Sequence, residues 1–282
     1  MNFFVKAHGL GNEYIVLDQS VIDFELTRGR ISMLCNIHLG IGSDGILLKV
    51  PSMSADFGLK IFNPDGSEAE KSGNGLRIFA KYLFDHGFTN HLTFSIETLG
   101  GIVTAHILEQ IQGKAFMIKI DMGKANFISK EIPVDFAGES CFNIPLSIEG
   151  ANYFIHCVSV GNPHCVVLRE HLDESEIRRV GPLIENHPMF PNRINVQFVK
   201  VVSPNEVEAL IWERGAGFTQ ASGSSSSAIA AVMVKKGLTN RDIAVNMPGG
   251  SLRIEVDELW NIRLTGEVRE IATGVLSKEL FW

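Results

Sequence analysis

The sequence predicts an α+β fold made of two similar halves, on three observations. Short runs rich in β-branched and aromatic residues outnumber segments of helical length. The helical segments stand singly among hairpin-like runs, which favours α+β over an alternating parallel fold. Two short motifs also recur 150 residues further along the chain. A length of 282 residues suits one large domain or two of ordinary size.

The individual elements follow from apolar spacing. Apolar residues at helical spacing predict helices over about 26–37, 73–87, 173–187 and 223–237. Apolar and β-branched runs predict strands, which we expect at 3–8, 45–50, 57–62, 92–98, 102–108, 115–122, 153–160, 195–202, 206–213, 243–248 and 252–256.

The repeat consists of two pairs of matching motifs. Gly11-Asn12 follows an apolar strand, and so does Gly161-Asn162. Ser72-Gly73 opens a helical segment, and so does Ser222-Gly223. Both pairs have the same offset, so we expect two domains that face each other, each bringing a strand-end Gly-Asn and a helix N-terminus to a shared cleft. We place the domains at about 1–118 and 119–272.

Composition narrows the class of partner. The net charge is −7 and no basic run occurs, so nucleic acid and anionic membranes are poor partners. No apolar stretch approaches the length of a membrane span, and the first residues lack the apolar region of a signal peptide. We therefore expect a cytoplasmic protein.

Cysteine and glycine patterns argue against metal and dinucleotide sites. The four cysteines (Cys35, Cys141, Cys157 and Cys165) form no C-x-x-C pair, and no H-E-x-x-H occurs. We expect reduced, mostly buried thiols and no metal site. Gly40 to Gly45 fits G-x-G-x-x-G, but the run that follows reads as a strand, whereas a dinucleotide site needs a helix there. A tight turn explains these glycines better.

The two Ser-Gly helix starts admit two interpretations. Serine is a common N-cap, so ordinary capping explains either one alone. Two helix N-termini that converge on one point would instead bind a carboxylate through backbone N–H groups. Ser72 and Ser222 would then flank a Cα from opposite sides, as the removal and return of its proton require. The helix ends would stabilise the enolate-like charge without a cofactor.

Two further positions are candidates. His164 follows a strand-end Gly-Asn-Pro, which suits a residue lining a cleft as well as an ordinary buried histidine. Glu213-Arg214 fits a strand-end ion pair, but arginine is also the best side chain for gripping a carboxylate.

Six ordered motifs resemble the diaminopimelate epimerases, a pyridoxal-independent family that interconverts LL- and meso-diaminopimelate. They are "HGLGNEYIVLD", "FNPDGSEAEKSGNGLRIFAKY", "VGNPHCVV", "NVQFV", "WERGAGFTQASG" and "MPGGSLRIEV". The resemblance covers the whole chain. It implies two domains, each with strands around a central helix, the active site between them, and a final strand near 273–282 that returns to the first domain. It also implies an isomerase of lysine and peptidoglycan precursor synthesis, with no cofactor, a small amino-acid substrate and a homodimer.

The resemblance also assigns roles to matching residues. The amides of Gly73, Asn74, Gly223 and Ser224 would hold the carboxylate at the reacting carbon. His164 and Glu213 would support the bases. The residues that would grip the substrate are Asn12, Asn63, Asn162, Asn195, Glu213 and Arg214.

The chain departs from the family at the bases, where the family has cysteine and this chain has Ser72 and Ser222. A thiol titrates near 8.5, and a serine hydroxyl is a far weaker acid. Three explanations fit: a deliberate double Cys→Ser substitution, a natural member with slower or different chemistry, including a racemase of another amino acid, or a binding protein that has lost turnover.

Overall fold

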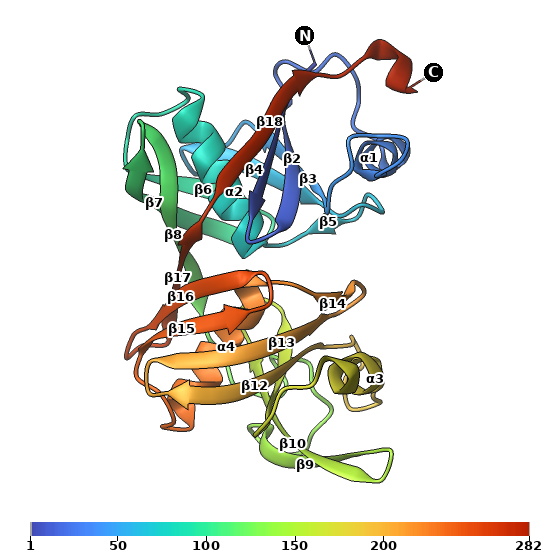
Figure 1. Cartoon of the computed structure of the whole chain (residues 1–282), viewed down its shortest axis with the longest axis vertical. Coiled ribbons are helices and arrows are strands. Elements are labelled where there is room, and N and C mark those ends of the chain that lie inside the picture. The colour runs from blue at the N-terminus through green and yellow to red at the C-terminus, as the bar shows by residue number, and fades with distance from the viewer. Residues whose placement is uncertain (1, 282) are drawn as a thin grey trace. The chain divides into compact units, whose positions relative to one another are not determined.

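The chain forms two compact units, seen in a computed structural model that describes residues 2–281 (Figure 1). One unit contains residues 1–120 and 265–282, and the other contains residues 121–264. The chain passes from the first unit to the second within strand β8 (Lys114–Lys124) and returns within β17 (Asn261–Glu267). We call these the N-terminal and the C-terminal unit.

The N-terminal unit contains two helices, a set of strands and a short terminal 3₁₀ helix. Besides β8, its elements are β1 (Phe3–Gly9), β2 (Asn12–Asp18), α1 (Arg28–Cys35), β3 (Ile46–Val50), β4 (Phe57–Phe62), β5 (Glu68–Ala69), α2 (Gly73–Asp85), β6 (Thr93–Thr98), β7 (Gly101–Ile111), β18 (Arg269–Val275) and η1 (Lys278–Phe281).

Most of the C-terminal unit has strands and helices in the same order as the N-terminal unit. Besides β17, they are β9 (Phe142–Ile148), β10 (Ala151–Ser159), β11 (Pro163–Leu168), α3 (Glu174–Glu185), β12 (Asn195–Ser203), β13 (Glu206–Glu213), β14 (Gly217–Thr219), α4 (Gly223–Lys235), β15 (Asp242–Met247) and β16 (Gly250–Val256).

Strand pairing repeats from one unit to the other. In the N-terminal unit β18, β1, β2, β3 and β4 lie side by side, and in the C-terminal unit β9, β10, β11, β12 and β13 do the same. The pairs β2–β3 and β11–β12 are both parallel, as are β4–β6 and β13–β15. The repeat inferred from two motifs thus extends to the whole topology, and the prediction of an α+β fold of two pseudo-symmetric halves is confirmed.

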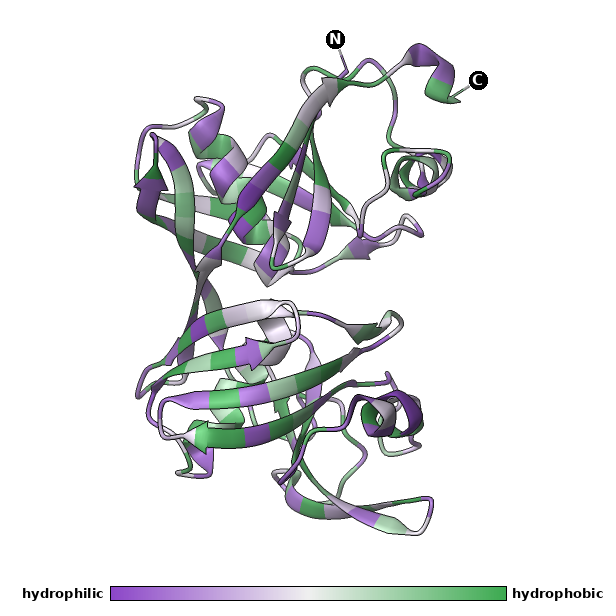
Figure 2. Cartoon of the chain, viewed as in Figure 1, coloured by the Kyte–Doolittle hydropathy of each residue, from purple (hydrophilic) through white to green (hydrophobic). Residues whose placement is uncertain are grey.

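Each unit is built around one central helix. Helix α2 contacts β1, β2 and β7, and α4 contacts β10, β11, β12, β15 and β16. Residues 73–83 of α2 are buried on every side, and so are residues 225–233 of α4. A helix buried all round belongs to the interior of a unit rather than to its surface. The surrounding strands alternate between apolar and polar residues, which Figure 2 shows as green and purple along β12 and β13.

The elements expected from the sequence agree closely with those observed. All four expected helices are present, and α2 and α4 begin 150 residues apart, at Gly73 and Gly223. The segment after Gly40–Gly45 is strand β3, as expected for a turn rather than a dinucleotide site. The four cysteines are reduced and buried, as expected. Strands β2, β5, β9, β11, β14 and β17 go beyond the expected runs, and β9 contains Pro145, a residue that ordinarily marks a sheet edge.

The last strand returns to the start of the chain. In β18, Val275 pairs with Phe3 of β1, and Figure 1 shows red β18 beside dark blue β1. The chain returns to the N-terminal unit at residue 265, whereas the sequence predicts this return at 273. The division into 1–118 and 119–272 stays a prediction. None of the helices in the described part of the chain has the length and apolar character that a membrane crossing requires.

Candidate active site

The two predicted bases are N-caps with nearly the same geometry. Ser72 has φ −139° and ψ 117°, and Ser222 has φ −147° and ψ 126°. The Gly75 amide donates to Ser72 Oγ over 3.0 Å, and the Ser225 amide donates to Ser222 Oγ over 3.4 Å. Capping and a role in a site are therefore compatible, because each hydroxyl keeps its own proton and further lone-pair capacity.

Capping leaves the first two amides of each helix without an acceptor among the described residues. The third and fourth amides of α2 bond to Oγ and to the carbonyl of Ser72, and α4 repeats this with Ser222. Among residues 2–281, no acceptor is found for the amides of Gly73, Asn74, Gly223 and Ser224. Unpaired N–H groups at a helix N-terminus attract an anion, so each helix start is suited to bind one.

The Gly-Asn motifs are tight turns that follow β1 and β10. Gly11 has φ +81° and Gly161 has φ +104°, values that a residue with a Cβ rarely adopts. An asparagine follows each of these glycines, and Asn12 accepts a hydrogen bond from Asn74 of α2.

A charged network surrounds the start of α2. Arg77 is fully buried and donates to Asn74 Oδ1 over 2.7 Å and to the Gly73 carbonyl over 3.1 Å. Asn74 donates to Asn12 Oδ1 over 3.1 Å, and Asn12 donates to Asp44 Oδ2 over 2.9 Å. Burial lowers the pKa of the Arg77 guanidinium to about 9, which leaves it charged at neutral pH. The network fixes Asn12 and Asn74 and places a cation behind the two free amides.

Arg77 is a residue that the sequence analysis missed. The apolar spacing of its helix gave no reason to expect a buried cation, because Leu76 and Phe79 alone suggest an ordinary core-facing stripe.

Tyr14 was missed as well, although the repeat contains the signal. Its hydroxyl lies 3.1 Å from Ser72 Oγ, and only 8% of the residue is exposed. Position 14 lies 150 residues before His164, so the repeat pairs this tyrosine with a residue that was already a candidate.

A neutral network surrounds the start of α4. His164 is fully buried, with Nε2 2.8 Å from Asn162 Oδ1 and Nδ1 3.0 Å from Gln197 Nε2. Gln197 also donates to Ser225 Oγ over 3.1 Å. Because Nδ1 accepts from an amide, the proton of the neutral ring lies on Nε2. Burial, followed by the charge of Arg214, lowers the pKa of His164 to about 3, so the ring is neutral at physiological pH.

Ser222 has no contact with His164 in this unit. Its hydroxyl lies 3.5 Å from Ser224 Oγ, and its amide lies 3.5 Å from Met247 Sδ. Only 4% of Ser222 is exposed. Gln197, which the quoted "NVQFV" motif contains, instead joins His164 to the helix at Ser225.

The residues expected to grip the distal end of a substrate lie at strand ends. In the C-terminal unit, Asn195 donates to the Pro163 carbonyl over 2.9 Å and accepts from the Arg214 amide over 2.9 Å. The Arg214 side chain donates to the Asn192 carbonyl over 3.0 Å. Glu213 is the last residue of β13. In the N-terminal unit, Asn63 donates to Ser67 Oγ over 2.9 Å.

Each unit thus brings part of the predicted set together. The N-terminal unit joins Asn12 and Asn74 in one network at Ser72–Gly73, while Asn63 belongs to a separate turn. The C-terminal unit joins Asn162 to His164, and Asn195 to Arg214.

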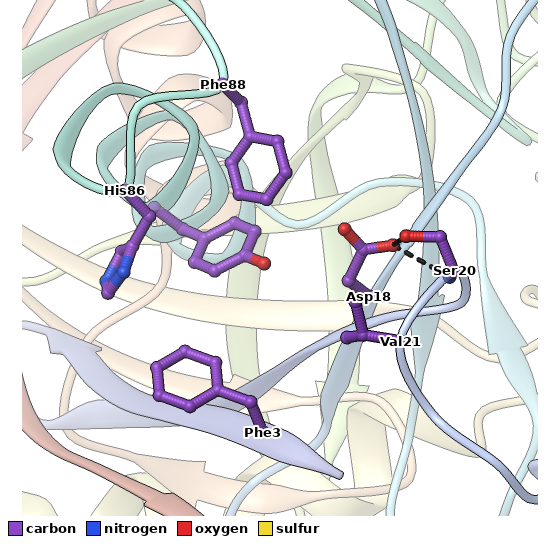
Figure 3. A pocket seen from close by; sticks show the side chains of 7 residues that line it. Phe3, Asp18, Ser20, Val21, His86 and Phe88 are labelled. Atoms are coloured by element: carbon purple, nitrogen blue, oxygen red, sulfur yellow. Dashed lines mark hydrogen bonds between the residues drawn. The ribbon is translucent and has the colours of Figure 1, made fainter. Parts of the chain in front are cut away.

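A separate pocket of about 530 Å³ lies at the other end of α2 (Figure 3). Figure 3 shows aromatic rings opposite the Asp18 carboxylate, which accepts hydrogen bonds from Ser20. None of the predicted site residues is among those that line it, which are Phe3, Asp18, Ser20, Val21, Tyr82, His86 and Phe88. Within residues 2–281, no group of three or more His, Cys, Asp or Glu side chains is arranged to hold a metal ion.

Comparison with known proteins identifies the family. The family model for diaminopimelate epimerase matches residues 4–128 and 156–271. The chain is 46% identical over 279 residues to diaminopimelate epimerase 2 of Nostoc sp., covering 99% of this chain and 96% of the relative. It is 40% identical over 273 residues to the diaminopimelate epimerase of Pelotomaculum thermopropionicum, covering 96% and 97% of the two chains.

Solved structures share the fold at much lower identity. A hydroxyproline epimerase from Agrobacterium vitis, solved with trans-4-hydroxy-L-proline, superimposes with a TM-score of 0.72 at 14% identity, covering 97% of this chain and 90% of that one. The sequence matches carry the assignment, and they agree with the two capped helix starts described above: this chain belongs to the diaminopimelate epimerase family.

Proposed function

We propose that this chain epimerises one Cα of diaminopimelate, between the LL and meso forms, without a cofactor. The observation that carries the proposal is the pair of helix starts, each with a serine N-cap and two amides that have no acceptor among the described residues. Family membership supplies the substrate class.

In the proposed complex, the carboxylate at the reacting carbon binds the amides of Gly73, Asn74, Gly223 and Ser224. The negative charge of the enolate-like intermediate grows on that carboxylate, where the donors are already oriented and need no rearrangement. Arg77 adds a buried positive charge behind the α2 amides. The carboxylate site is thus the part of the machinery that needs no thiol.

Proton transfer would use Ser72 on one face of Cα and Ser222 on the other. This requires the two domains, residues 1–118 with 273–282 and residues 119–272, to enclose the substrate between them. His164 and Glu213 would support the bases. Asn12, Asn63, Asn162, Asn195, Glu213 and Arg214 would hold the substrate, and the planar fork of Arg214 suits the distal carboxylate.

The expected setting is cytoplasmic, and the expected assembly is a homodimer. Both follow from the resemblance to a family of biosynthetic enzymes rather than from a contact in this chain.

Exchange of the Cα proton for solvent deuterium tests the proposal. The chain is incubated with LL- or meso-diaminopimelate in D₂O, and deuterium at Cα is followed by proton NMR or mass spectrometry. We expect exchange at one Cα of each isomer, even where net inversion is slow. Tight binding of diaminopimelate with no exchange, both in this chain and after Ser72→Cys with Ser222→Cys, would favour the binding-protein alternative.

A further inference from the structure

The serine of the N-terminal half has a partner that the serine of the C-terminal half lacks. Tyr14 Oη lies 3.1 Å from Ser72 Oγ, and either oxygen can donate the proton between them. Ser72 Oγ also accepts the Gly75 amide over 3.0 Å. This hydroxyl therefore lies between a fixed donor and a phenol.

The strand next to β2 makes room for the Tyr14 ring. A Cβ at Gly45 would lie 2.7 Å from Tyr14 Cε1, which is closer than carbon atoms pack. The Gly45 carbonyl accepts the amide of Ile15, the neighbour of Tyr14, over 3.1 Å. A glycine at position 45 therefore lets the ring lie where its hydroxyl reaches Ser72.

The repeat places Tyr14 opposite His164 in the other half. Tyr14 follows Asn12 by two residues on β2, and His164 follows Asn162 by two residues on β11. Both strands run parallel to the next one, β3 or β12. His164 bonds to Asn162 and Gln197 and makes no bond to Ser222, so only the N-terminal half joins its proton-bearing side chain to its serine.

We propose that Tyr14 is the proton-relay partner of Ser72 and thereby a positioning residue for the reaction on one face of Cα. In the forward step, the Cα–H bond breaks and the proton forms a new bond to Ser72 Oγ. The Ser72 O–H bond breaks at the same time, and its proton passes to the Tyr14 phenolate. The electron pair of the Cα–H bond moves into the bound carboxylate, so the negative charge of the phenolate ends on the substrate. The return step reverses these transfers and starts from a neutral phenol.

The relay explains how a serine, a weak acid, can act as the base at this position. A serine hydroxyl needs an adjacent group to take its proton before it can act as a base. A phenol is a much stronger acid than an alcohol and can carry that proton at 3.1 Å. Ser72 alone would have to form an alkoxide, whereas Ser72 with Tyr14 does not.

The test compares Tyr14→Phe in two backgrounds and rests on the proposed function. Phenylalanine keeps the ring and removes only the hydroxyl, so folding should be retained. With Ser72 present, we expect Tyr14→Phe to slow deuterium exchange by about 10²-fold or more for the stereoisomer whose Cα proton Ser72 removes. The affinity for diaminopimelate, measured by calorimetry, should not change. In the Ser72→Cys background, the same change should cost less than about threefold, because a thiol ionises without help.

Tyr82→Phe is the matched control. Tyr82 lies on α2 and lines the pocket of Figure 3, away from the helix start, so losing its hydroxyl should leave exchange unchanged in either background. An equal loss from Tyr14→Phe in both backgrounds would mean that the ring only supports the fold, and the relay would be wrong.

A second readout is the pH profile. Exchange through the relay should rise with pH, because the phenol must lose its proton, and Tyr14→Phe should flatten that rise. Other titratable groups near the site are Glu13 beside Tyr14, Asp44 bonded to the Glu13 amide, Arg77 in the first turns of α2, and Lys71 beside Ser72. Burial lowers the pKa of Lys71. Lys71→Met should retain the rise if Tyr14 carries it.

The relay and the proposed function can fail separately. A parent chain that binds diaminopimelate without exchange overturns the relay, because Tyr14 then fails to make Ser72 competent. If Ser72→Cys with Ser222→Cys restores exchange to that chain, the assignment of the substrate and of the two base positions survives and only the serine chemistry fails. If it does not, both fail.

Discussion

The starts of α2 and α4 share their backbone geometry but differ in nearly every surrounding side chain. Around α2, a buried arginine, two asparagines and an aspartate form a charged network, and the capping serine bonds to a tyrosine. Around α4, a histidine, a glutamine and serines form a network without formal charge, and the capping serine has no titratable partner in its unit.

This difference separates two parts of the proposed chemistry. The amides that would bind the carboxylate come from the backbone and are repeated, since they depend only on a capped helix start. The groups that would move protons come from side chains, and each half has its own. The four predictions below change residues of one half or of both, and they run from the largest expected effect to the smallest.

Replacing the serines by thiols should have the largest effect. Ser72→Cys with Ser222→Cys should raise epimerisation by about 10²-fold or more, the scale of general acid–base catalysis, with little change in diaminopimelate affinity. Of the single changes, Ser222→Cys should help more, because Ser72 already has Tyr14 as a partner. Coupled epimerase assays on the three variants measure this, and a larger gain from Ser72→Cys would contradict the asymmetry.

Removing the buried cation of the N-terminal half should destabilise the fold. Arg77→Met leaves Asn74 Oδ1 without its donor, at about 1–3 kcal/mol, and removes a second bond to the Gly73 carbonyl, which keeps the amide partner of its helix. The matched control is Ser227→Ala at the equivalent position of α4, where one hydrogen bond to the Gly223 carbonyl is lost, worth about 1 kcal/mol. Urea unfolding compares the two, and equal costs would show that the Arg77 network contributes nothing special.

Mild acid should destabilise the C-terminal unit. Burial lowers the pKa of His156 to about 4 and that of His164 to about 3, from an ordinary value near 6.5. Below about pH 6.5 these histidines bind protons in the unfolded chain but stay neutral in the folded chain. The free energy of unfolding should therefore fall by about 1.4 kcal/mol for each histidine and each pH unit of acidification, until the pKa of the folded state is reached. Above pH 6.5 neither histidine should contribute.

Urea unfolding at pH 6.5, 5.5 and 4.5 measures that slope. His156→Phe removes one of the two groups and should halve it. A slope that is the same with and without His156 would rule out this origin for the acid sensitivity.

Exchanging one equivalent residue between the halves should have the smallest effect. Gln197 corresponds to Leu47 by the offset of 150, and its Oε1 is buried without a hydrogen-bond partner in residues 2–281. Gln197→Leu loses two hydrogen bonds but also removes that unpaired oxygen, so the free energy of unfolding should change by about 1 kcal/mol or less. Urea unfolding of the variant beside the parent chain measures this change.

Backbone features were the part of the molecule that the sequence could predict. The Ser-Gly pairs located both helix starts because a capping serine and a glycine have few other uses before an apolar run. The offset of 150 residues then predicted a topological repeat that the strand order confirms. The strand β9 escaped because a proline and half-exposed positions weaken its pattern.

Side-chain networks were harder to predict, for a physical reason. Periodicity separates apolar from polar residues, so it assigns Arg77 and Lys81 to a helix surface, yet both are buried. Lys81 is buried because its ammonium lies 2.7 Å from the Asp85 carboxylate one turn later. Tyr14 could have been found, since its offset from His164 equals that of the serines. Other hydrogen bonds join residues far apart in the sequence, such as Gln197 and Ser225, and no pattern in the sequence shows that these two side chains lie close together.

The pairing of Phe3 with Val275 has a consequence for the order in which the molecule is made. The C-terminal unit is one continuous stretch and can complete its sheet as soon as residue 264 has left the ribosome. The N-terminal unit, although synthesised first, lacks β18, one of the two partners of β1, until residues 269–275 are made, and contacts so distant in sequence form slowly. During synthesis the edge of β1 is therefore open to wrong partners, a known route to aggregation. The unit that begins the chain is the last to be closed.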